Sequence, residues 1–100
     1  QRFTASDRLT NFRTELSQKK LAELRRNKDE LERLFAELFG PIAAIDNTDG
    51  LRITFRTREI IHLRPSGNAP ELRCYTESST ESRAKELNDA ALALWRAHAQ

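Results

Sequence analysis

All the glycines and prolines of this chain lie at three places: Gly40-Pro41, Gly50 and the segment 65–70. Glycine readily adopts left-handed backbone conformations and proline donates no backbone hydrogen bond, so both residues mark the ends of helices and strands. The spacing of the apolar residues changes at the first of these places, from a helical repeat before Gly40 to alternation after Pro41. We therefore expect a helical part followed by several short strands.

Residues 14–39 have the apolar spacing of one long amphipathic helix. Leucines and Phe35 fall close to one face, charged side chains largely cover the rest, and Gly40-Pro41 ends the pattern. A helix of this kind can bind a membrane or a partner helix, but it more often packs its apolar face on a sheet of its own domain. We expect the second arrangement.

A second helix is predicted over residues 80–97, where apolar residues again recur at helical spacing. Ser78 and Glu81 have the spacing of a capping box at its start. Trp95 is expected to anchor this helix on the sheet, because a large aromatic side chain on an apolar helix face gains most from burial.

Apolar and polar residues alternate between the two predicted helices, which predicts four strands at residues 42–45, 51–56, 60–64 and 72–77. Asp49-Gly50 is a typical hairpin turn, and the acidic run around it lacks the downstream ligands of a calcium-binding loop. The expected fold class is α+β, with a four-stranded antiparallel sheet and two helices packed on one face. Residues 1–13 are expected to be irregular or partly extended.

The composition restricts the classes of partner. The 100 residues suit one small domain, and 38% hydrophobic residues suffice for one modest core. The net charge is +2, from 17 Lys and Arg against 15 Asp and Glu, and the two signs are interspersed. Proteins that bind nucleic acids usually concentrate basic residues on one face, and no apolar run here approaches the roughly 20 residues that span a bilayer. We therefore expect neither a nucleic acid nor a membrane as the partner.

Cys74 and His62 are expected to be structural residues. Cys74 is the only cysteine, so an internal disulfide is impossible and a reducing compartment fits. Its place in a predicted strand favours a buried thiol over a nucleophile. His62 also lies in a predicted strand, and no Cys, His or carboxylate stands at metal-ligand spacing from it.

The segment between the last two predicted strands combines the groups that bind phosphate. Arg64, Ser66, Gly67 and Asn68 lie within five residues, and Arg73 follows shortly after. Phosphate binds to guanidinium groups, to short hydrogen-bonding side chains and to backbone N–H groups turned inward. Gly67 has no Cβ to keep the backbone away from an anion. The alternative is an ordinary Pro and Gly turn with surface arginines nearby.

Residues 64–73, RPSGNAPELR, resemble the phosphate-binding loop in the C-terminal domain of the α-D-phosphohexomutases, and most of all that of the phosphomannomutases. Residues 2–9 resemble the lead-in to that domain, and residues 49–53 resemble the strand before the loop. Ala69 stands where many relatives have glutamate, so any contact made by that glutamate is absent here or is supplied by Glu71.

The resemblance implies a role for each residue of the candidate site. Arg64 would be the main guanidinium donor, and Ser66 would offer its hydroxyl and its N–H. Gly67 would supply a backbone N–H, and Asn68 occupies a position where relatives often carry threonine. Arg73 lies where relatives often have an arginine after the loop, and it would be a further guanidinium near the phosphate. No catalytic or metal-binding residue is implied in this chain.

The resemblance further implies that residues 1–13 are a leading segment or interdomain linker, and that residues 14–100 are the C-terminal phosphate-binding domain of a longer phosphohexomutase with a TATA-box-binding-protein-like fold. Such enzymes convert a hexose 6-phosphate into the 1-phosphate. This domain would anchor the non-reacting phosphate of the mannose or glucose phosphate. The other three domains would supply the phosphoserine, the Mg²⁺ site and the loop that reads the sugar. The isolated chain would be inactive and would contain no cofactor of its own.

Two further expectations follow from the resemblance. The sequence is closer to the phosphomannomutases than to the phosphoglucosamine mutases, and bifunctional phosphomannomutase and phosphoglucomutase activity in the cytoplasm fits it. The alternative is a freestanding α+β protein-interaction module, in which residues 14–39 dock a partner and the loop is ordinary.

Overall fold

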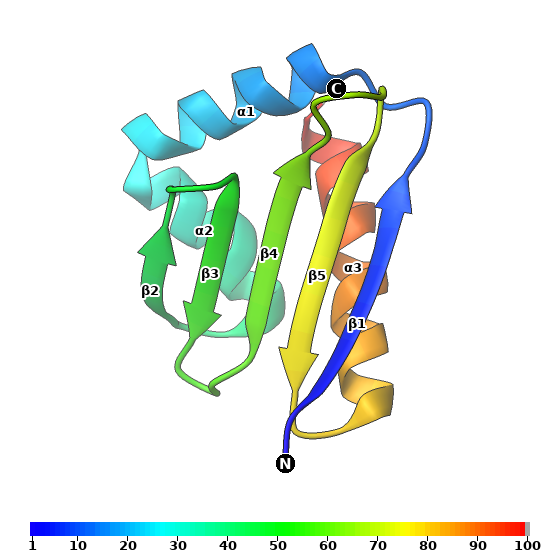
Figure 1. Cartoon of the computed structure of the whole chain (residues 1–100). Helices are drawn as coiled ribbons and strands as arrows, with labels where there is room; N and C mark the ends of the chain where they lie inside the picture. Colours follow the sequence, from blue (N-terminus) through cyan, green and yellow to red (C-terminus); the bar gives the residue numbers. More distant parts are fainter. Residues whose placement is uncertain (100) are drawn as a thin grey trace.

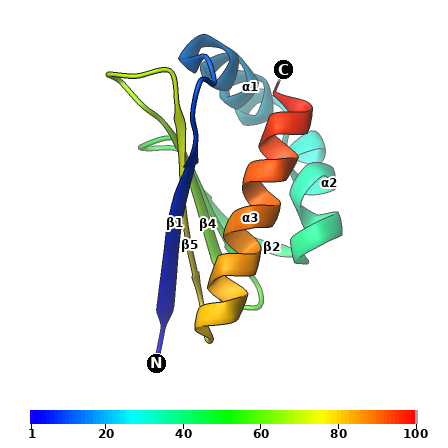
Figure 2. The same cartoon turned by 90° about the vertical axis from the view of Figure 1, so that its right-hand side faces the viewer.

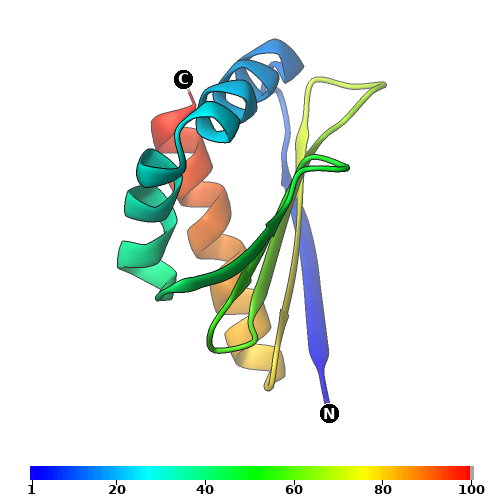
Figure 3. The same cartoon turned by 90° about the vertical axis from the view of Figure 1, so that its left-hand side faces the viewer.

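The computed structural model describes residues 1–99. Five strands and three helices follow one another along the chain: β1 (Phe3–Leu9), α1 (Thr14–Arg26), α2 (Lys28–Phe39), β2 (Ile42–Asp46), β3 (Leu51–Phe55), β4 (Ile60–Pro65), β5 (Leu72–Ser78) and α3 (Glu81–His98). The strands form one antiparallel sheet in the order β1-β5-β4-β3-β2 (Figure 1). Figures 2 and 3 show the sheet from its two edges, with all three helices on the same face. The α+β class and the antiparallel sheet are therefore confirmed, and the other face of the sheet carries no helix of the described chain.

The sheet has five strands, so the prediction of four was wrong. The additional strand is β1, in the segment expected to be irregular or partly extended, and it pairs with β5 from Phe3 opposite Ser78 to Leu9 opposite Leu72. Its own sequence alternates poorly, since the charged Asp7 stands where an apolar residue would complete the pattern. The pairing with β5 determines the extended conformation of this edge strand.

The predicted single helix over residues 14–39 is two helices, which brings the number of helices to three. Asn27 separates them with φ −134° and ψ 88°, and its side chain accepts a hydrogen bond of 3.1 Å from the N–H of Glu30. Asparagine is a strong N-cap because its side-chain oxygen satisfies an N–H that has no partner in the first helical turn. Lys20 binds the Glu30 carboxylate at 2.9 Å across the break. The apolar spacing continues through Asn27 and so did not reveal the break.

Helix α3 forms where the apolar spacing of residues 80–97 predicts a helix, but its N-cap is a different residue from the predicted one. The side chain of Thr80 accepts a hydrogen bond from the N–H of Arg83 at 3.1 Å. Ser78, the expected cap, is instead the buried last residue of β5, and its hydroxyl donates to Glu59 at 2.8 Å. The predicted capping box of Ser78 and Glu81 was therefore wrong by two residues.

The hydrophobic core lies between the sheet and the helices. Strands β3, β4 and β5 turn alternate apolar residues toward α3 and α2. Trp95 of α3 is fully buried, as predicted, and its indole N–H donates to the hydroxyl of Ser17 in α1 at 3.1 Å. Cys74 is also fully buried, and burial raises the pKa of its thiol to about 12. The prediction of a buried thiol is therefore confirmed.

Candidate functional site

The loop between β4 and β5 closes on itself through backbone and side-chain hydrogen bonds. The N–H of Ser66 donates to the carbonyl of Glu71 at 3.0 Å, and the N–H of Glu71 donates to the carbonyl of Ala69 at 2.8 Å. The N–H of Asn68 donates to the Ser66 hydroxyl oxygen at 3.3 Å. The Ser66 N–H, which we expected to face a ligand, is thus occupied within the loop, while the hydrogen of its hydroxyl remains available.

The start of α1 supports this loop from the side. The Thr14 hydroxyl lies 3.2 Å from the carbonyl oxygens of both Ser66 and Ala69 and donates to them, and the N–H of Phe12 donates to the carbonyl of Pro70 at 2.7 Å. Figure 1 shows α1 at the same end of the sheet as the loop. Because these carbonyls accept hydrogen bonds from α1 and from the residues before it, the loop is held against the rest of the domain.

Two N–H groups of the loop have no hydrogen-bond partner among residues 1–99, those of Gly67 and Ala69. Gly67 is exposed, and a Cβ built on it would meet no atom within 4 Å. Its φ is not in the left-handed region, so nothing in the fold of this chain requires glycine there. Open space beside an unpaired N–H is what an anion needs to approach the backbone.

Arg64 ends β4 directly before the loop and pairs with Asp49 of the turn between β2 and β3. Its Nη2 lies 2.9 Å from Asp49 Oδ2, and both side chains are largely exposed, at 43% and 62%. The Nε of Arg64 is buried and makes no hydrogen bond to a described residue. The guanidinium is thus held in place by one carboxylate and retains unused donors.

The β2–β3 turn is held against β4 by backbone geometry and by His62. Gly50 has φ +72°, and a Cβ on it would lie 2.2 Å from the carbonyl oxygen of Leu63. Only glycine allows this close approach. His62 Nε2 lies 2.7 Å from the carbonyl oxygen of Asp49 and donates to it, since a carbonyl only accepts. The hairpin predicted at Asp49-Gly50 is therefore confirmed, and it places the Asp49 carboxylate beside the guanidinium of Arg64.

Arg64 and Arg73 lie directly opposite each other on β4 and β5, so the structure brings these two predicted site residues together. Directly opposite residues of an antiparallel pair project from the same face of a sheet. Leu72 and Cys74 face the core, and Arg73 is exposed on the other face, as the alternation predicts. Arg73 forms no ion pair with any of residues 1–99.

Sequence reasoning missed one arginine at this site. Arg8 of β1 lies directly opposite Arg73, so a row of three arginines crosses β1, β5 and β4. The Nε of Arg8 lies 3.5 Å from Glu71 Oε2. No local signal could have placed Arg8 here, because its position depends on the pairing of β1 with β5.

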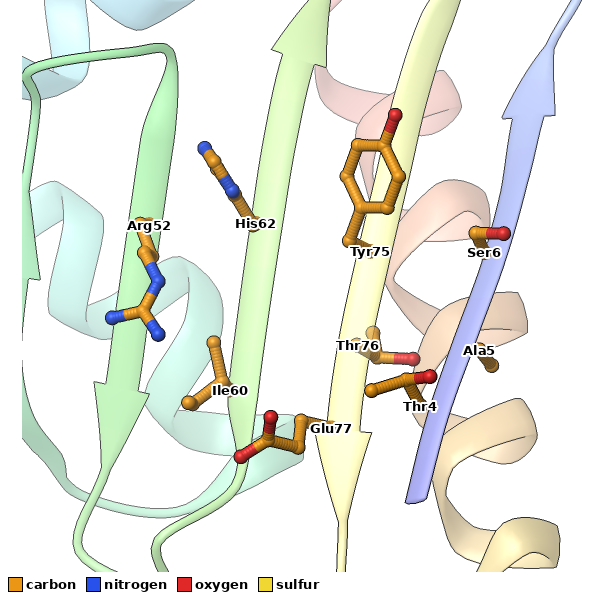
Figure 4. Close-up of a pocket in the computed structure, with 9 residues that line it drawn as sticks. All are labelled: Thr4, Ala5, Ser6, Arg52, Ile60, His62, Tyr75, Thr76 and Glu77. Carbon is orange, nitrogen blue, oxygen red and sulfur yellow. The ribbon is translucent and has the colours of Figure 1, made fainter. Parts of the chain in front are cut away.

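We call the face of the sheet without helices the open face. Next to the arginine row, its residues line a hollow of about 360 Å³. Figure 4 shows its lining, with His62 of β4 and Tyr75 of β5 pointing out from neighbouring strands. Their ring centroids are 6.1 Å apart. Arg52 of β3 and Ser6 of β1 complete this row across the sheet. Within residues 1–99, no cluster of three or more Cys, His, Asp or Glu side chains could hold a metal ion.

Comparison with known proteins assigns the family. Residues 9–94 match the model of the family described as phosphoglucomutase/phosphomannomutase, C-terminal domain. The chain belongs to this family. The resemblance drawn from the loop sequence is thereby confirmed, and the match extends from the last residue of β1 to α3.

Two curated phosphomannomutases are similar to this member of the family. A phosphomannomutase of Sinorhizobium fredii (strain NBRC 101917 / NGR234) is 42% identical over 89 residues, which cover 89% of this chain and 19% of the relative. A phosphomannomutase of Salmonella muenchen is 55% identical over 47 residues, which cover 47% of this chain and 10% of the relative. The chain thus spans about a fifth or less of the length of these relatives. No helix in the described part of the chain has the length and apolar character of a membrane span.

Proposed function

We propose that this chain is the C-terminal domain of a phosphomannomutase or bifunctional phosphomannomutase/phosphoglucomutase, and that it anchors the non-reacting phosphate of the hexose phosphate. The observation that carries the proposal is the pair of directly opposed arginines, Arg64 and Arg73. They lie beside the β4–β5 loop, in which the N–H groups of Gly67 and Ala69 have no partner among residues 1–99. The 42% identity to a phosphomannomutase over most of the chain supports the choice of substrate class.

The phosphate would replace the Asp49 carboxylate on Arg64. An exposed ion pair of this kind contributes at most about 1 kcal/mol, whereas phosphate can accept two parallel bonds from one guanidinium. Arg64 has further donors for this, because only its Nη2 is paired with Asp49 and its side chain is 43% exposed. In this proposal the bidentate contact with the anion outweighs the exposed pair with Asp49.

The remaining contacts come from the loop. The hydroxyl of Ser66 and the N–H of Gly67 would donate to phosphate oxygens, and the amide side chain of Asn68 would contribute a further N–H. The N–H of Ser66 donates to the carbonyl of Glu71 and does not bind phosphate in this proposal. The free N–H of Ala69 donates to phosphate instead. Arg73 supplies the second guanidinium from β5.

A phosphate anchor of this kind suits a mutase. Either phosphate of a bisphosphorylated intermediate can occupy it, so it should recognise phosphate and not a particular sugar. Binding energy gained at the remote phosphate then positions the reacting end of the substrate. In this proposal the phosphoserine and Mg²⁺ belong to other domains of the longer cytoplasmic protein, and this chain contributes no catalytic residue. Membership of the mutase family favours this proposal over a freestanding interaction module.

The experiment is a titration of the ¹⁵N-labelled chain with mannose 6-phosphate, followed by the amide shifts. A dissociation constant near millimolar is expected, about 4 kcal/mol of binding free energy. Saturable shifts at Ser66, Gly67 and Asn68 that disappear in Arg64→Ala, but persist in the exposed control Arg96→Ala, would support the proposal. Shifts scattered over the surface, or equal loss in both variants, would contradict it.

A further inference from the structure

The row of three arginines on the open face is costly for the folded chain. Arg8, Arg73 and Arg64 are directly opposite one another on adjacent strands, which lie about 4.8 Å apart. Like charges at directly opposite positions destabilise a sheet. The arrangement is therefore best explained by an anion that binds across the strands.

The carboxylates nearby neutralise only the two ends of the row. Asp49 pairs with Arg64, and Glu71 lies beside Arg8. Arg73, in the middle, has no carboxylate partner within residues 1–99. The middle arginine thus has no carboxylate within ion-pair distance.

The contact between Arg8 and Glu71 is loose. At 3.5 Å it is longer than the 2.7–2.9 Å of a charge-assisted hydrogen bond. Glu71 Oε2 is buried and accepts no hydrogen bond from a described residue. The side chain of Arg8 is 59% exposed, whereas that of Glu71 is only 13% exposed. Arg8 is therefore free to turn its donors toward a ligand on the open face.

Two hydroxyl groups lie next to Arg8 and Arg73 in the row. Ser6 and Tyr75 form the next directly opposed pair of β1 and β5, on the same face as Arg8 and Arg73. Together with Asp7, these four side chains line a shallow hollow of about 350 Å³. Two guanidinium groups and two hydroxyls are the donor set for a phosphate or a similar dianion.

We propose that Arg8 is a third phosphate-binding arginine, so that the phosphate anchor extends from the loop across β5 to β1, with Glu71 as the counter-ion that Arg8 exchanges for phosphate. This inference rests on the proposed function. Arg8 lies one residue before the segment that matches the family model, so the match does not include it. Phosphate that binds Arg64 and Arg73 is within one strand spacing of Arg8, and its arrival releases Arg8 from Glu71.

The proposal predicts opposite effects of the two partners, which a structural role of their ion pair would not produce. Arg8→Gln should weaken the binding of inorganic phosphate by roughly three- to tenfold, the effect of one lost hydrogen bond of ordinary net strength. Glu71→Gln should strengthen it by a few-fold, because the competing carboxylate is gone. If the pair only stabilised the fold, both variants would weaken binding.

The test is a titration of the chain with inorganic phosphate and, separately, with mannose 6-phosphate, monitored at the amides and at the arginine Nε–H signals. The chain has its own buried core and can be titrated alone. The matched control is Arg96→Gln, which removes one exposed positive charge from α3 on the other side of the sheet. Unchanged amide spectra away from the substituted residue would show that each variant is folded, and Arg8→Lys, which keeps the charge but loses the fork, should bind with intermediate affinity.

The outcomes separate this inference from the proposed function. If Arg64→Ala abolishes binding while Arg8→Gln and Arg96→Gln bind like the unmodified chain, the extension to β1 is wrong and the anchor stands. If neither Arg64→Ala nor Arg8→Gln changes the affinity, both are wrong. A reduction in Arg8→Gln that exceeds the reduction in Arg96→Gln, together with stronger binding by Glu71→Gln, supports the extension.

Discussion

The guanidinium of Arg64 lies 2.9 Å from the carboxylate of Asp49, because a residue just before β3 and a residue near the end of β4 lie at the same open end of the antiparallel β3–β4 pair. The pair holds the arginine at the mouth of the loop, yet it occupies donors that a phosphate would use. In the proposed site Asp49 is therefore both a support for Arg64 and a competitor of the phosphate.

Removal of this carboxylate should strengthen phosphate binding. We expect Asp49→Asn to lower the dissociation constant for inorganic phosphate about two- to fivefold, since an exposed pair is worth at most about 1 kcal/mol. The control is Asp29→Asn, an exposed acid of α2 that removes the same charge. Titration followed at Gly67 measures the effect. Weaker binding by Asp49→Asn would mean that the support of Arg64 matters more than the competition.

The Thr14 hydroxyl should be needed for an ordered loop. Thr14→Val removes the hydrogen bonds to Ser66 and Ala69 and leaves both carbonyls without that partner, so we expect the free energy of unfolding to fall by about 1 kcal/mol. Phosphate binding should weaken as well, because the loop must then be ordered when the ligand binds. Urea unfolding and the phosphate titration measure the two effects, and Thr10→Val, at an exposed position, is the control. Unchanged affinity would exclude a role for Thr14 in the site.

Two glycines should respond in opposite ways to alanine. Gly50→Ala should destabilise the chain by about 2 kcal/mol or more, because φ is +72° and the new Cβ would collide with the Leu63 carbonyl. Gly67→Ala should leave the stability nearly unchanged, since its surroundings are open, but it should weaken phosphate binding. Urea unfolding and titration of both variants test this contrast. Strong destabilisation by Gly67→Ala would show that this glycine serves the fold.

The Glu59 carboxylate should make the stability of the chain depend on pH in the acid range. Burial alone would raise the pKa of Glu59, but hydrogen bonds from Arg83 and Ser78 outweigh burial and lower it below the ordinary value of 4.5. Its contribution is therefore present above pH 4.5 and is lost as the pH falls through the lower pKa of the folded state. We expect Glu59→Gln to reduce the free energy of unfolding at neutral pH by about 1–3 kcal/mol. The difference from the unmodified chain should shrink in acid, as measured by urea unfolding at both pH values, and a constant difference would contradict this account.

The thiol of Cys74 should be unreactive in the folded chain. Burial raises its pKa to about 12 from the 9.0 of an exposed thiol, so the thiolate is scarce and inaccessible. Stability should fall as the pH rises from 9.0 toward 12, since only the unfolded chain then loses the proton. A thiol reagent in mildly alkaline buffer should react slowly with the folded chain and rapidly in denaturant. Equal rates would show that β5 opens readily.

Much of the fold could be predicted from local patterns. The alternation in residues 51–56 and 72–77 predicted β3 and β5, which run over Leu51–Phe55 and Leu72–Ser78, and Asp49-Gly50 predicted the hairpin between β2 and β3. Two features escaped prediction for identifiable reasons. Strand β1 lacks an apolar alternation and is extended because β5 pairs with it, and the break at Asn27 falls within an unbroken helical repeat.

The candidate site divides in the same way. The loop sequence by itself predicted a phosphate-binding group of Arg64, Ser66, Gly67, Asn68 and Arg73 and indicated the family, because these residues are close along the chain and their chemistry is local. Tertiary structure alone decided that Asp49 forms an ion pair with Arg64 and that the carbonyl of Glu71 accepts a hydrogen bond from the N–H of Ser66. It also placed Arg8 directly opposite Arg73 in the β1–β5 pair. Arg8 and Arg73 are far apart in sequence, and a pattern within one segment contains no information about which strand will pair beside it.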